Sequence, residues 1–490
     1  MIELEFQSAV NLVKAIQDKK ISSSELLEIY IERYKRLNPR INAIVFTDFE
    51  NARTKAKKAD EALARGEDWG VLHGLPVTIK DSFEVVGMPC ASGSPELKDY
   101  MPANNAVVVD ALLEAGAIVF GKTNLPRFAM DIQSYNDVYG QTNNPWDVSK
   151  TPGGSSGGGA AALASGLTCL EVGSDNGGSL RNPPHFCGVC GHKPTFNLVP
   201  LRGHVPPLPG LFPGEYTGDG DIGVAGPMAR NVEDLELAMK LLVQPKIFQK
   251  PAWKFTLPKP RRENLKSYRI ASWLDDPAFT VDDQVGDRLQ AAVDELLVAG
   301  ATIKEKKPDI DFTECHDIYS KLLTASTSPL LPQEDLDYAI SEKPKLDEMD
   351  LGFRAQWIRG ATISHREWLV LDYLRLMMRQ KWADFFKDFD ALMCPVIPVT
   401  AFPHDHSEYM DRTLIVNGKA RSYPDTYLPW AGLTCVSYLP STVVPVGLAQ
   451  NGLPVGMQIV GPYLEDRTAL HVAKLVEKTI GGFTPPPGFE

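Results

Sequence analysis

The stretch Thr151-Pro-Gly-Gly-Ser-Ser-Gly-Gly-Gly-Ala-Ala-Ala-Leu-Ala164 joins a glycine-rich turn directly to a strong helix-forming run. Ala and Leu favour helix, and Gly166 supplies a residue that can end it. A flexible Gly/Ser linker is the simpler interpretation, but a glycine-rich turn that leads into a helix is typical of a site. The Gly-x-Ser-x-Gly pattern around Ser155 also matches a nucleophile elbow, which needs a preceding strand where this sequence predicts a loop.

Two further clusters carry chemistry. In Gly173-Ser-Asp-Asn-Gly-Gly-Ser-Leu-Arg181, two glycines precede Ser179 and allow successive backbone N–H groups to face the space above its hydroxyl. That geometry would form an oxyanion hole. In Gly74-Leu-Pro-Val-Thr-Ile-Lys-Asp81, Lys80 ends an apolar strand. A surface lysine is the ordinary alternative, but burial would favour the neutral amine, which can act as a base.

Together these clusters resemble the amidase signature family, serine hydrolases that cleave amides with a Ser-Ser-Lys triad. The resemblance covers nearly the whole chain and rests on segments in the family's order: Gly74 to Asp81, Gly121-Lys-Thr-Asn124, Pro152-Gly-Gly-Ser-Ser-Gly-Gly158, Gly177-Gly-Ser-Leu-Arg-Asn-Pro183, Phe186-Cys-Gly-Val189, Lys193-Pro-Thr195 and Gly452-Leu-Pro-Val-Gly-Met-Gln458. It implies an α/β fold with one large domain, in which helices cover both faces of a central mixed β-sheet.

The resemblance implies that Ser179 is the nucleophile, Lys80 the base and Ser155 the bridging serine, often held by a cis peptide bond. The spacing of 24 residues between Ser155 and Ser179 agrees with that of the family, and the resemblance therefore selects Ser155 over Ser156. A lysine whose pKa is lowered by burial to roughly 7–8 can accept the proton of Ser179 through the hydroxyl of Ser155 and later return it to the leaving nitrogen. Four backbone N–H groups would hold the oxyanion, those of Asn176, Gly177, Gly178 and Ser179.

Three departures bear on the substrate. Asn176 stands where the family commonly has Thr, Ile or Leu, and we expect function to be retained because its backbone is what serves the oxyanion. Asn182 differs from the Gln typical of the glutamine-hydrolysing subunit of tRNA-dependent amidotransferases, and residues 199–207 lack that subunit's usual pattern. These departures favour an independent amidase for aryl or acyl amides, with esters and carbamates as related substrates. The amidotransferase subunit is the alternative.

The substrate pocket is expected to include Met130, Tyr135 and Trp430, together with a variable, mostly helical region at about residues 311–386. Aromatic side chains in these segments favour apolar or aryl groups, although core packing explains them equally well. Neither a metal ion nor a cofactor is expected.

Charge and hydropathy limit the partners of the 490-residue chain. Its net charge of -12 would repel a phosphate backbone, so nucleic acid is not expected to bind. The first residues are not expected to form a secretory signal. Of two long uncharged runs, residues 151–170 are mostly small and residues 426–464 are broken by prolines into pieces that predict buried strands, not membrane spans. We expect a cytoplasmic monomer or homodimer that acts on a small-molecule amide or carbamate, away from membranes.

Hydrophobic periodicity predicts an N-terminal helical segment over residues 1–66. The resemblance implies that residues 67–490 form the catalytic domain. After residue 70, short apolar runs alternate with helical patterns as in βαβ units. Near the end of the chain, buried strands are predicted at 390–398 and 443–460, before a closing helix at about 467–478.

Two motifs suggest other chemistry. Gly116-Ala-Ile-Val-Phe-Gly-Lys-Thr123 satisfies the phosphate-loop pattern, but its apolar centre predicts a strand, so a nucleotide-binding protein is a remote alternative. His185, Cys187, Cys190 and His192 could supply zinc ligands, but one short stretch cannot wrap a tetrahedron. Buried thiols are favoured, and a role for Cys187 and Cys190 beyond packing stays open.

Overall fold

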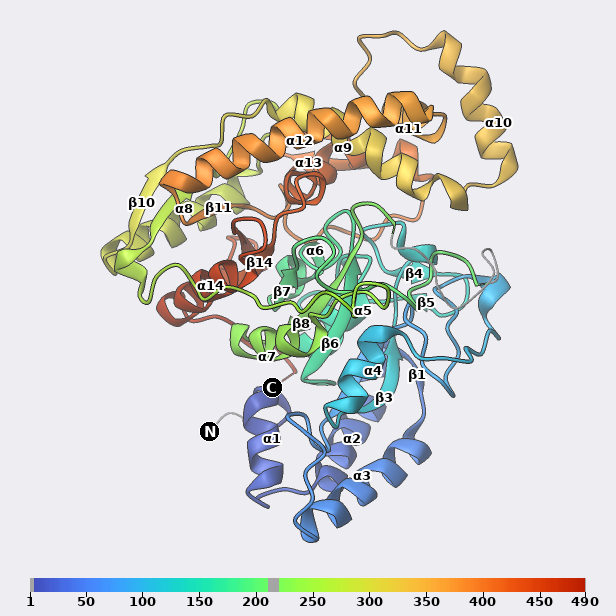
Figure 1. Ribbon diagram of the computed structural model, residues 1–490, viewed down its shortest axis with the longest axis vertical. Coiled ribbons are helices and arrows are strands. Elements are labelled where there is room, and N and C mark those ends of the chain that lie inside the picture. Colours follow the sequence, from blue (N-terminus) through green and yellow to red (C-terminus); the bar gives the residue numbers. More distant parts are fainter. Residues whose placement is uncertain (1–3, 210–219, 490) are drawn as a thin grey trace.

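The computed structural model describes residues 4–209 and 220–489. Its centre is a mixed β-sheet with helices on both faces (Figure 1). Helices α1 to α3 lie below the sheet in this view, and α9 to α12 form the part above it. This is the single-domain α/β architecture expected from the sequence.

The large sheet contains eight strands. The pairs β10–β9 and β9–β11 are parallel, whereas the pairs beyond β11 are antiparallel. In spatial order the strands are β10 (Thr302–Glu305), β9 (Arg269–Ser272), β11 (Ala391–Pro395), β15 (Pro454–Val460), β14 (Ser441–Leu448), β7 (Cys190–Lys193), β8 (Val224–Ala229) and β6 (Leu170–Asp175). Every residue of β6, β7, β8, β11 and β15 is buried. This agrees with the largely apolar sequences of β8, β11 and β15, whereas β6 and β7 also bury polar and charged side chains.

A second sheet of three strands adjoins the large one along β6. Its order is β1 (Ile44–Thr47), β3 (Ile118–Thr123) and β2 (Pro76–Lys80). The carboxylate of Glu171 in β6 links the two sheets, since it accepts hydrogen bonds from the hydroxyls of Thr78 in β2 and Thr123 in β3. This contact fixes the end of β2 next to the end of β6. Two short pairs, β4 (Tyr135–Asn136) with β5 (Gly140–Gln141) and β12 (Thr413–Val416) with β13 (Lys419–Ser422), lie outside both sheets.

Most of the phosphate-loop motif forms β3, the central strand of the small sheet. All residues of β3 are buried, and Lys122 Nζ lies 3.3 Å from a carboxylate oxygen of Asp81 and donates to the carbonyl of Phe83. A phosphate cradle needs a curled loop with free N–H groups, which a paired strand does not offer. The nucleotide-binding alternative is therefore wrong.

The N-terminal segment forms α1 (Ala9–Gln17), α2 (Ser23–Ile41) and α3 (Phe49–Ala64). These helices begin after Ser8, Ser22 and Asp48, whose side chains accept a backbone N–H from the first turn. The sequence predicts only helices here, whereas the structure adds β1. This four-residue strand pairs with β3 and joins the segment to the small sheet.

The other helices cover the sheets and build the upper part of the molecule. They are α4 (Val107–Glu114), α5 (Gly157–Ala164), α6 (Asn182–Cys187), α7 (Val232–Leu242), α8 (Asp283–Val298), α9 (Phe312–Thr327), α10 (Gln333–Glu342), α11 (Phe353–Ala361), α12 (His365–Asp388), α13 (Tyr423–Val436) and α14 (Asp466–Ile480). The expected helical region at 311–386 corresponds to α9 through α12, and the closing helix corresponds to α14.

Helix α13 departs from the sequence prediction, which expects buried strands across residues 426–464. Only β14 and β15 bear that prediction out. In α13, Pro424 occupies the first turn, where proline is tolerated, and every residue except Asp425 is buried. A helix that is buried all round has no amphipathic period, so its sequence cannot be distinguished from that of a buried strand by periodicity.

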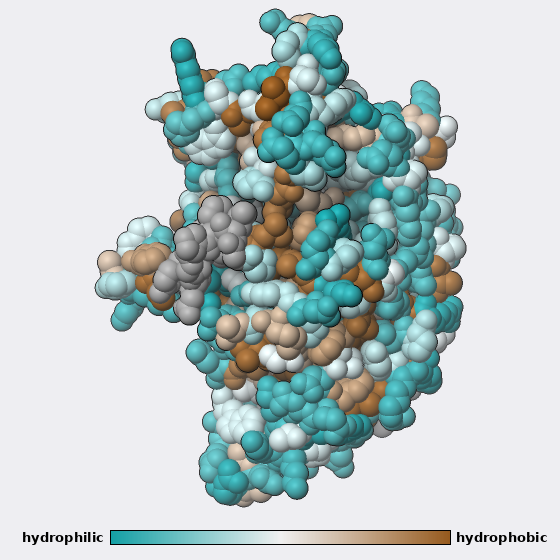
Figure 2. All heavy atoms as spheres, turned by 90° about the vertical axis from the view of Figure 1, so that its right-hand side faces the viewer, coloured by the Kyte–Doolittle hydropathy of each residue, from teal (hydrophilic) through white to brown (hydrophobic). Residues whose placement is uncertain are grey.

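The surface is mostly polar. Figure 2 shows apolar side chains gathered in the hollow between the upper and lower parts of the visible face. Across residues 4–209 and 220–489, the helices are all too short or too polar to span a membrane.

Candidate active site

Three segments bring Lys80, Ser155 and Ser179 together. Lys80 is the last residue of β2, Ser155 lies in the turn before α5, and Ser179 follows the end of β6. Both serines line a cavity of about 490 Å³ and are nearly buried, with exposed fractions of 1% for Ser155 and 4% for Ser179. The contact between β2 and β6 therefore places the predicted base and the predicted nucleophile at the same end of neighbouring strands.

Lys80 is fully buried, and among the described residues the hydrogen-bond partners of its Nζ are hydroxyl groups. Its Nζ lies 2.7 Å from Ser155 Oγ, 3.0 Å from Ser156 Oγ and 3.1 Å from Ser174 Oγ. Burial lowers the pKa of Lys80 to about 7, although the nearby carboxylates of Asp175 and Glu171 act in the opposite direction.

The turn before α5 and the first turn of α5 depend on glycine residues. The Gly154–Ser155 peptide bond is cis. A Cβ atom at Gly158 would lie 2.4 Å from the backbone nitrogen of Asn124, so a larger residue could not fit without a backbone shift. Ser134 closes the turn, because its Oγ donates to the carbonyl of Gly153 and accepts the N–H of Gly157. The glycines thus allow α5 to approach its neighbours closely and hold Ser155 in place.

The turn after β6 is built around a buried ion pair between Asp175 and Arg181, whose charged atoms lie 2.9 Å apart. Asp175 also accepts the backbone N–H groups of Gly178 and Leu180, each at 2.9 Å. Burial alone would raise the pKa of Asp175, but the charge and hydrogen bonds of Arg181 lower it to about 2. The carboxylate therefore stays ionised and shapes the loop that carries Ser179.

Of the backbone N–H groups from Asn176 to Ser179, one bonds within the turn and the others have no acceptor in the described chain. Within the described part of the chain, those of Asn176, Gly177 and Ser179 have no hydrogen-bond acceptor, whereas Gly178 donates to Asp175. This corrects the expectation that four consecutive N–H groups face an oxyanion, because the N–H of Gly178 is already engaged. Gly178 is still required as glycine, since its φ is +104°. Three donors are left for a ligand.

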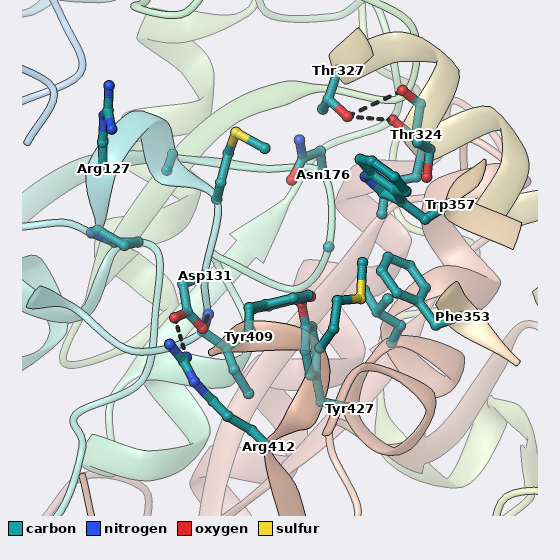
Figure 3. Close-up of a pocket in the computed structure, with 18 of the residues that line it drawn as sticks. Arg127, Asp131, Asn176, Thr324, Thr327, Phe353, Trp357, Tyr409, Arg412 and Tyr427 are labelled. Carbon is teal, nitrogen blue, oxygen red and sulfur yellow. Dashed lines mark hydrogen bonds and ion pairs between the residues drawn. The ribbon is translucent and has the colours of Figure 1, made fainter. Parts of the chain in front are cut away.

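A larger cavity of about 640 Å³ also reaches Ser179 (Figure 3). Trp357, Phe353 and Tyr427 form an aromatic wall, and Asp131 and Arg412 face one another on the opposite side. Arg412 forms an ion pair with Asp131, and their charged atoms lie 2.6 Å apart. The cavity thus offers mainly apolar contact, and the two charges of this pair neutralise each other. The lining also includes the charged residues Arg127, Asp137, Asp335, Arg354 and Glu408.

The three predicted substrate-binding residues have different positions. Met130 and Tyr135 line the large cavity, and the hydroxyl of Tyr135 accepts a hydrogen bond from Arg412. Trp430 does not line it: its indole is fully buried and donates to the carbonyl of Phe279. The inclusion of Trp430 is therefore wrong. In α13 it is Tyr427 and Leu428 that face the cavity.

The proposed zinc ligands have separate partners. His185 contacts the carbonyls of Val399 and Gly456, and His192 contacts Thr442 and Asp466. All seven cysteines are free and buried, and burial raises the pKa of the Cys187 thiol well above its usual range. Among the residues that the structure describes, no three His, Cys, Asp or Glu side chains are grouped to hold a metal ion. The zinc alternative is therefore not supported.

The family profile described as Amidase matches residues 25–470, which is most of the chain.

The chain belongs to the Amidase family. It is an enzyme, and its activity is the hydrolysis of amides, the reaction for which the family is named.

Individual relatives of this amidase differ in their described roles. It is 33% identical to an indoleacetamide hydrolase of Bradyrhizobium diazoefficiens, over 97% of this chain and 86% of the relative. It is also 31% identical to one subunit of the glutamyl-tRNA(Gln) amidotransferase of Anaeromyxobacter dehalogenans, over 96% of this chain and 95% of the relative. A solved structure described as an amidase superposes with a TM-score of 0.79 at 26% identity, covering 97% of this chain and all of the other.

Sequence reasoning missed several residues around the triad of this amidase. Glu171 gave a usable signal, since a carboxylate between Leu170 and Val172 in an apolar strand must find buried partners. Burial raises its pKa to about 7, against the effect of its bonds from two threonines. The pairing of Asp131 with Arg412 had no signal, because 281 residues separate them.

Breaking the buried ion pair between Asp175 and Arg181 should strongly destabilise the protein. We expect Asp175→Asn to lower the free energy of unfolding by about 3–5 kcal/mol, since it leaves the Arg181 guanidinium buried without its counter-charge. Denaturant titration measures the change. Asp18→Asn, which breaks the exposed pair with Lys20, is the matched control and should have little effect. An equal loss of unfolding free energy in the two variants would contradict the conclusion that the buried pair stabilises the protein.

Proposed function

We propose that Ser179 attacks the carbonyl carbon of the amide and that Ser155 and Lys80 carry its proton. The observation that supports this most strongly is the buried Lys80 Nζ, held 2.7 Å from Ser155 Oγ with a pKa lowered to about 7. At neutral pH a large fraction of such an amine is uncharged and can accept a proton. An ordinary lysine, with a pKa of about 10.4, could not do so.

The bridging hydroxyl allows one proton path to serve both halves of the reaction. Ser155 accepts the proton of Ser179 while it gives its own proton to Lys80. An amide nitrogen leaves only when it is protonated, and the same path in reverse supplies that proton. Water then replaces the amine, loses a proton to the same relay and releases the acid from Ser179.

The N–H groups of Asn176, Gly177 and Ser179 are proposed to stabilise the oxyanion. They are the three donors of this turn without an acceptor in the described chain. Their value is greatest in the transition state, when the carbonyl oxygen becomes charged, and one lost donor costs about 2.7–4 kcal/mol in comparable sites. The carbonyl of Asn176 accepts the Tyr319 hydroxyl at 2.8 Å, which supports the position of the first peptide.

The two cavities suggest how the amide is oriented. Ser155 lines the smaller cavity, so the leaving nitrogen, which receives its proton from Ser155, is placed on that side. The acyl half then occupies the larger cavity with its aromatic wall. We propose an apolar, aryl-bearing acyl group as the preferred substrate. The relative described as an indoleacetamide hydrolase is consistent with such a group.

Glutamine hydrolysis within a tRNA-dependent amidotransferase is the second candidate, because many relatives are described as that subunit. Free glutamine carries an ammonium and a carboxylate that both need counter-charges. In the larger cavity Asp131 and Arg412 are bound to each other, so using them would break a buried pair. This ion pair and the aromatic wall favour an apolar substrate, whereas the other charged residues of the lining, among them Arg127 and Glu408, keep glutamine as the second candidate.

The nucleophile can be tested by labelling. A fluorophosphonate should modify Ser179, as located by peptide mass spectrometry, and Ser179→Ala should abolish both labelling and amide hydrolysis. Ser155→Ala and Lys80→Met should remain folded and lose activity by at least about 10²-fold, the usual contribution of proton transfer. Ser149 is exposed and lines neither cavity, so Ser149→Ala is the control and should retain full activity. Labelling at another serine would contradict the proposal.

The pH dependence follows from the state of Lys80. Because the neutral amine is the active form, kcat/KM should rise with pH and reach half its maximum near pH 7. Glu171 titrates in the same range, so Glu171→Gln is needed to separate the two groups. The rise of kcat/KM near pH 7 should persist in Glu171→Gln. Loss of this rise in the variant, or a rise centred near the ordinary pKa of lysine, would contradict its assignment to Lys80.

The substrate class can be tested with the purified chain alone. An arylacetamide should be hydrolysed with a kcat/KM at least about tenfold higher than acetamide or glutamine, since burying one aromatic ring contributes well over 1.4 kcal/mol. Trp357→Ala should reduce this preference while leaving acetamide turnover nearly unchanged. Preferred turnover of glutamine would instead support the amidotransferase candidate.

A further inference from the structure

His204 contacts the triad through a serine outside it. The residue is half-buried in the connection between β7 and β8 and lines the smaller cavity beside Ser155. Its Nε2 lies 2.8 Å from Ser174 Oγ, and its Nδ1 lies 2.8 Å from the carbonyl oxygen of Pro206. The ring packs edge-on against Phe83, with centroids 5.0 Å apart. Both ring nitrogens are therefore engaged, and the ring has a defined orientation.

The partner of Nδ1 fixes the tautomer. A carbonyl oxygen only accepts hydrogen bonds, so Nδ1 must carry a hydrogen to bond Pro206. Burial lowers the pKa of His204 to about 4, so the ring is neutral and its Nε2 is an acceptor. The Ser174 hydroxyl must then donate to Nε2, and its lone pairs are left to face Lys80.

The hydroxyl of Ser156 is also oriented as an acceptor for Lys80. Its Oγ lies 3.4 Å from the carbonyl oxygen of Ser174, which can only accept, so its hydroxyl hydrogen points there and its lone pairs also face Lys80. A neutral amine has two N–H groups and one lone pair. With Ser156 and Ser174 both acting as acceptors, the two N–H groups are used and the lone pair is left for Ser155.

We propose that His204 is a positioning residue, which fixes Ser174 as an acceptor and thereby directs the lone pair of Lys80 at Ser155. The inference rests on the proposed function, because it assigns His204 a role in the Lys80 relay.

The arrangement suits both states of the lysine. When Ser155 gives up its hydrogen, the N–H bond forms along the existing 2.7 Å contact and Ser155 takes the hydrogen of Ser179. The resulting ammonium donates to all three serines, and neither Ser156 nor Ser174 has to rotate. The charged groups near Lys80 are Asp175 and Glu171, which favour its protonated form, while His204 stays neutral. Without the imidazole, Ser174 could donate to the lone pair and compete with Ser155.

The first test is kinetic. His204→Ala should lower kcat for an arylacetamide by about 10- to 100-fold, with KM changed less than about twofold, since only a step after binding is affected. His204→Gln, whose amide oxygen can accept from Ser174, should recover most of the loss. In the Ser174→Ala background, His204→Ala should have little further effect, because the two residues act as one unit. The exposed His365→Gln is the matched control and should be fully active.

The second test does not require activity. Nitrogen-15 spectra of histidine-labelled full-length protein, assigned by the loss of one spin system in His204→Gln, should show His204 as the neutral tautomer protonated at Nδ1. A tautomer protonated at Nε2, or an imidazolium at neutral pH, would overturn the proposal. So would an unchanged kcat in His204→Ala, or effects that simply add in the double variant. An inactive wild type, or an active Ser179→Ala variant, would instead overturn the proposed function.

Discussion

The structure depends on the burial of an amine that could carry a positive charge. Lys80 ends a wholly buried strand and is itself fully buried. An ion in such a position is costly unless it is paired, and an unpaired amine responds by losing its proton. Its immediate partners are three serine hydroxyls, which stabilise either state of the amine. The site therefore keeps a lysine near the midpoint of its titration, which a direct ion pair would prevent.

Two carboxylates lie close enough to Lys80 to raise its pKa, and each is restrained by other contacts. Asp175 is paired with Arg181 and accepts two backbone N–H groups, so its charge is balanced within its own turn. Glu171 accepts from two threonine hydroxyls, and burial favours its neutral form. Because neither forms a hydrogen bond with the amine, the two sheets can be joined by polar contacts beside the site without locking Lys80 as a cation.

Local patterns in the sequence were sufficient to predict much of the fold and the segments of the candidate site. Capped amphipathic helices, the apolar strands and the segments that carry Lys80, Ser155 and Ser179 depend on neighbours in the chain. What escaped prediction depends on distant contacts. Burial on all sides hid the helical character of α13, and the side chain of Trp430 turned into the core. The bond from the Gly178 N–H to Asp175 is local, but it forms only because the turn after β6 folds around the buried pair of Asp175 and Arg181. The position of His204 beside Ser174 likewise follows only from the folded chain.

The groups proposed to handle the proton and the walls of the larger cavity come from separate parts of the sequence. The former lie between Lys80 and His204, whereas much of the aromatic wall comes from α11 and α13, more than 100 residues later. Substitutions in those helices can reshape the space for the acyl group without touching the hydroxyls around the lysine. Such a division allows selection to change which substrate is recognised while the residues around Lys80 stay the same.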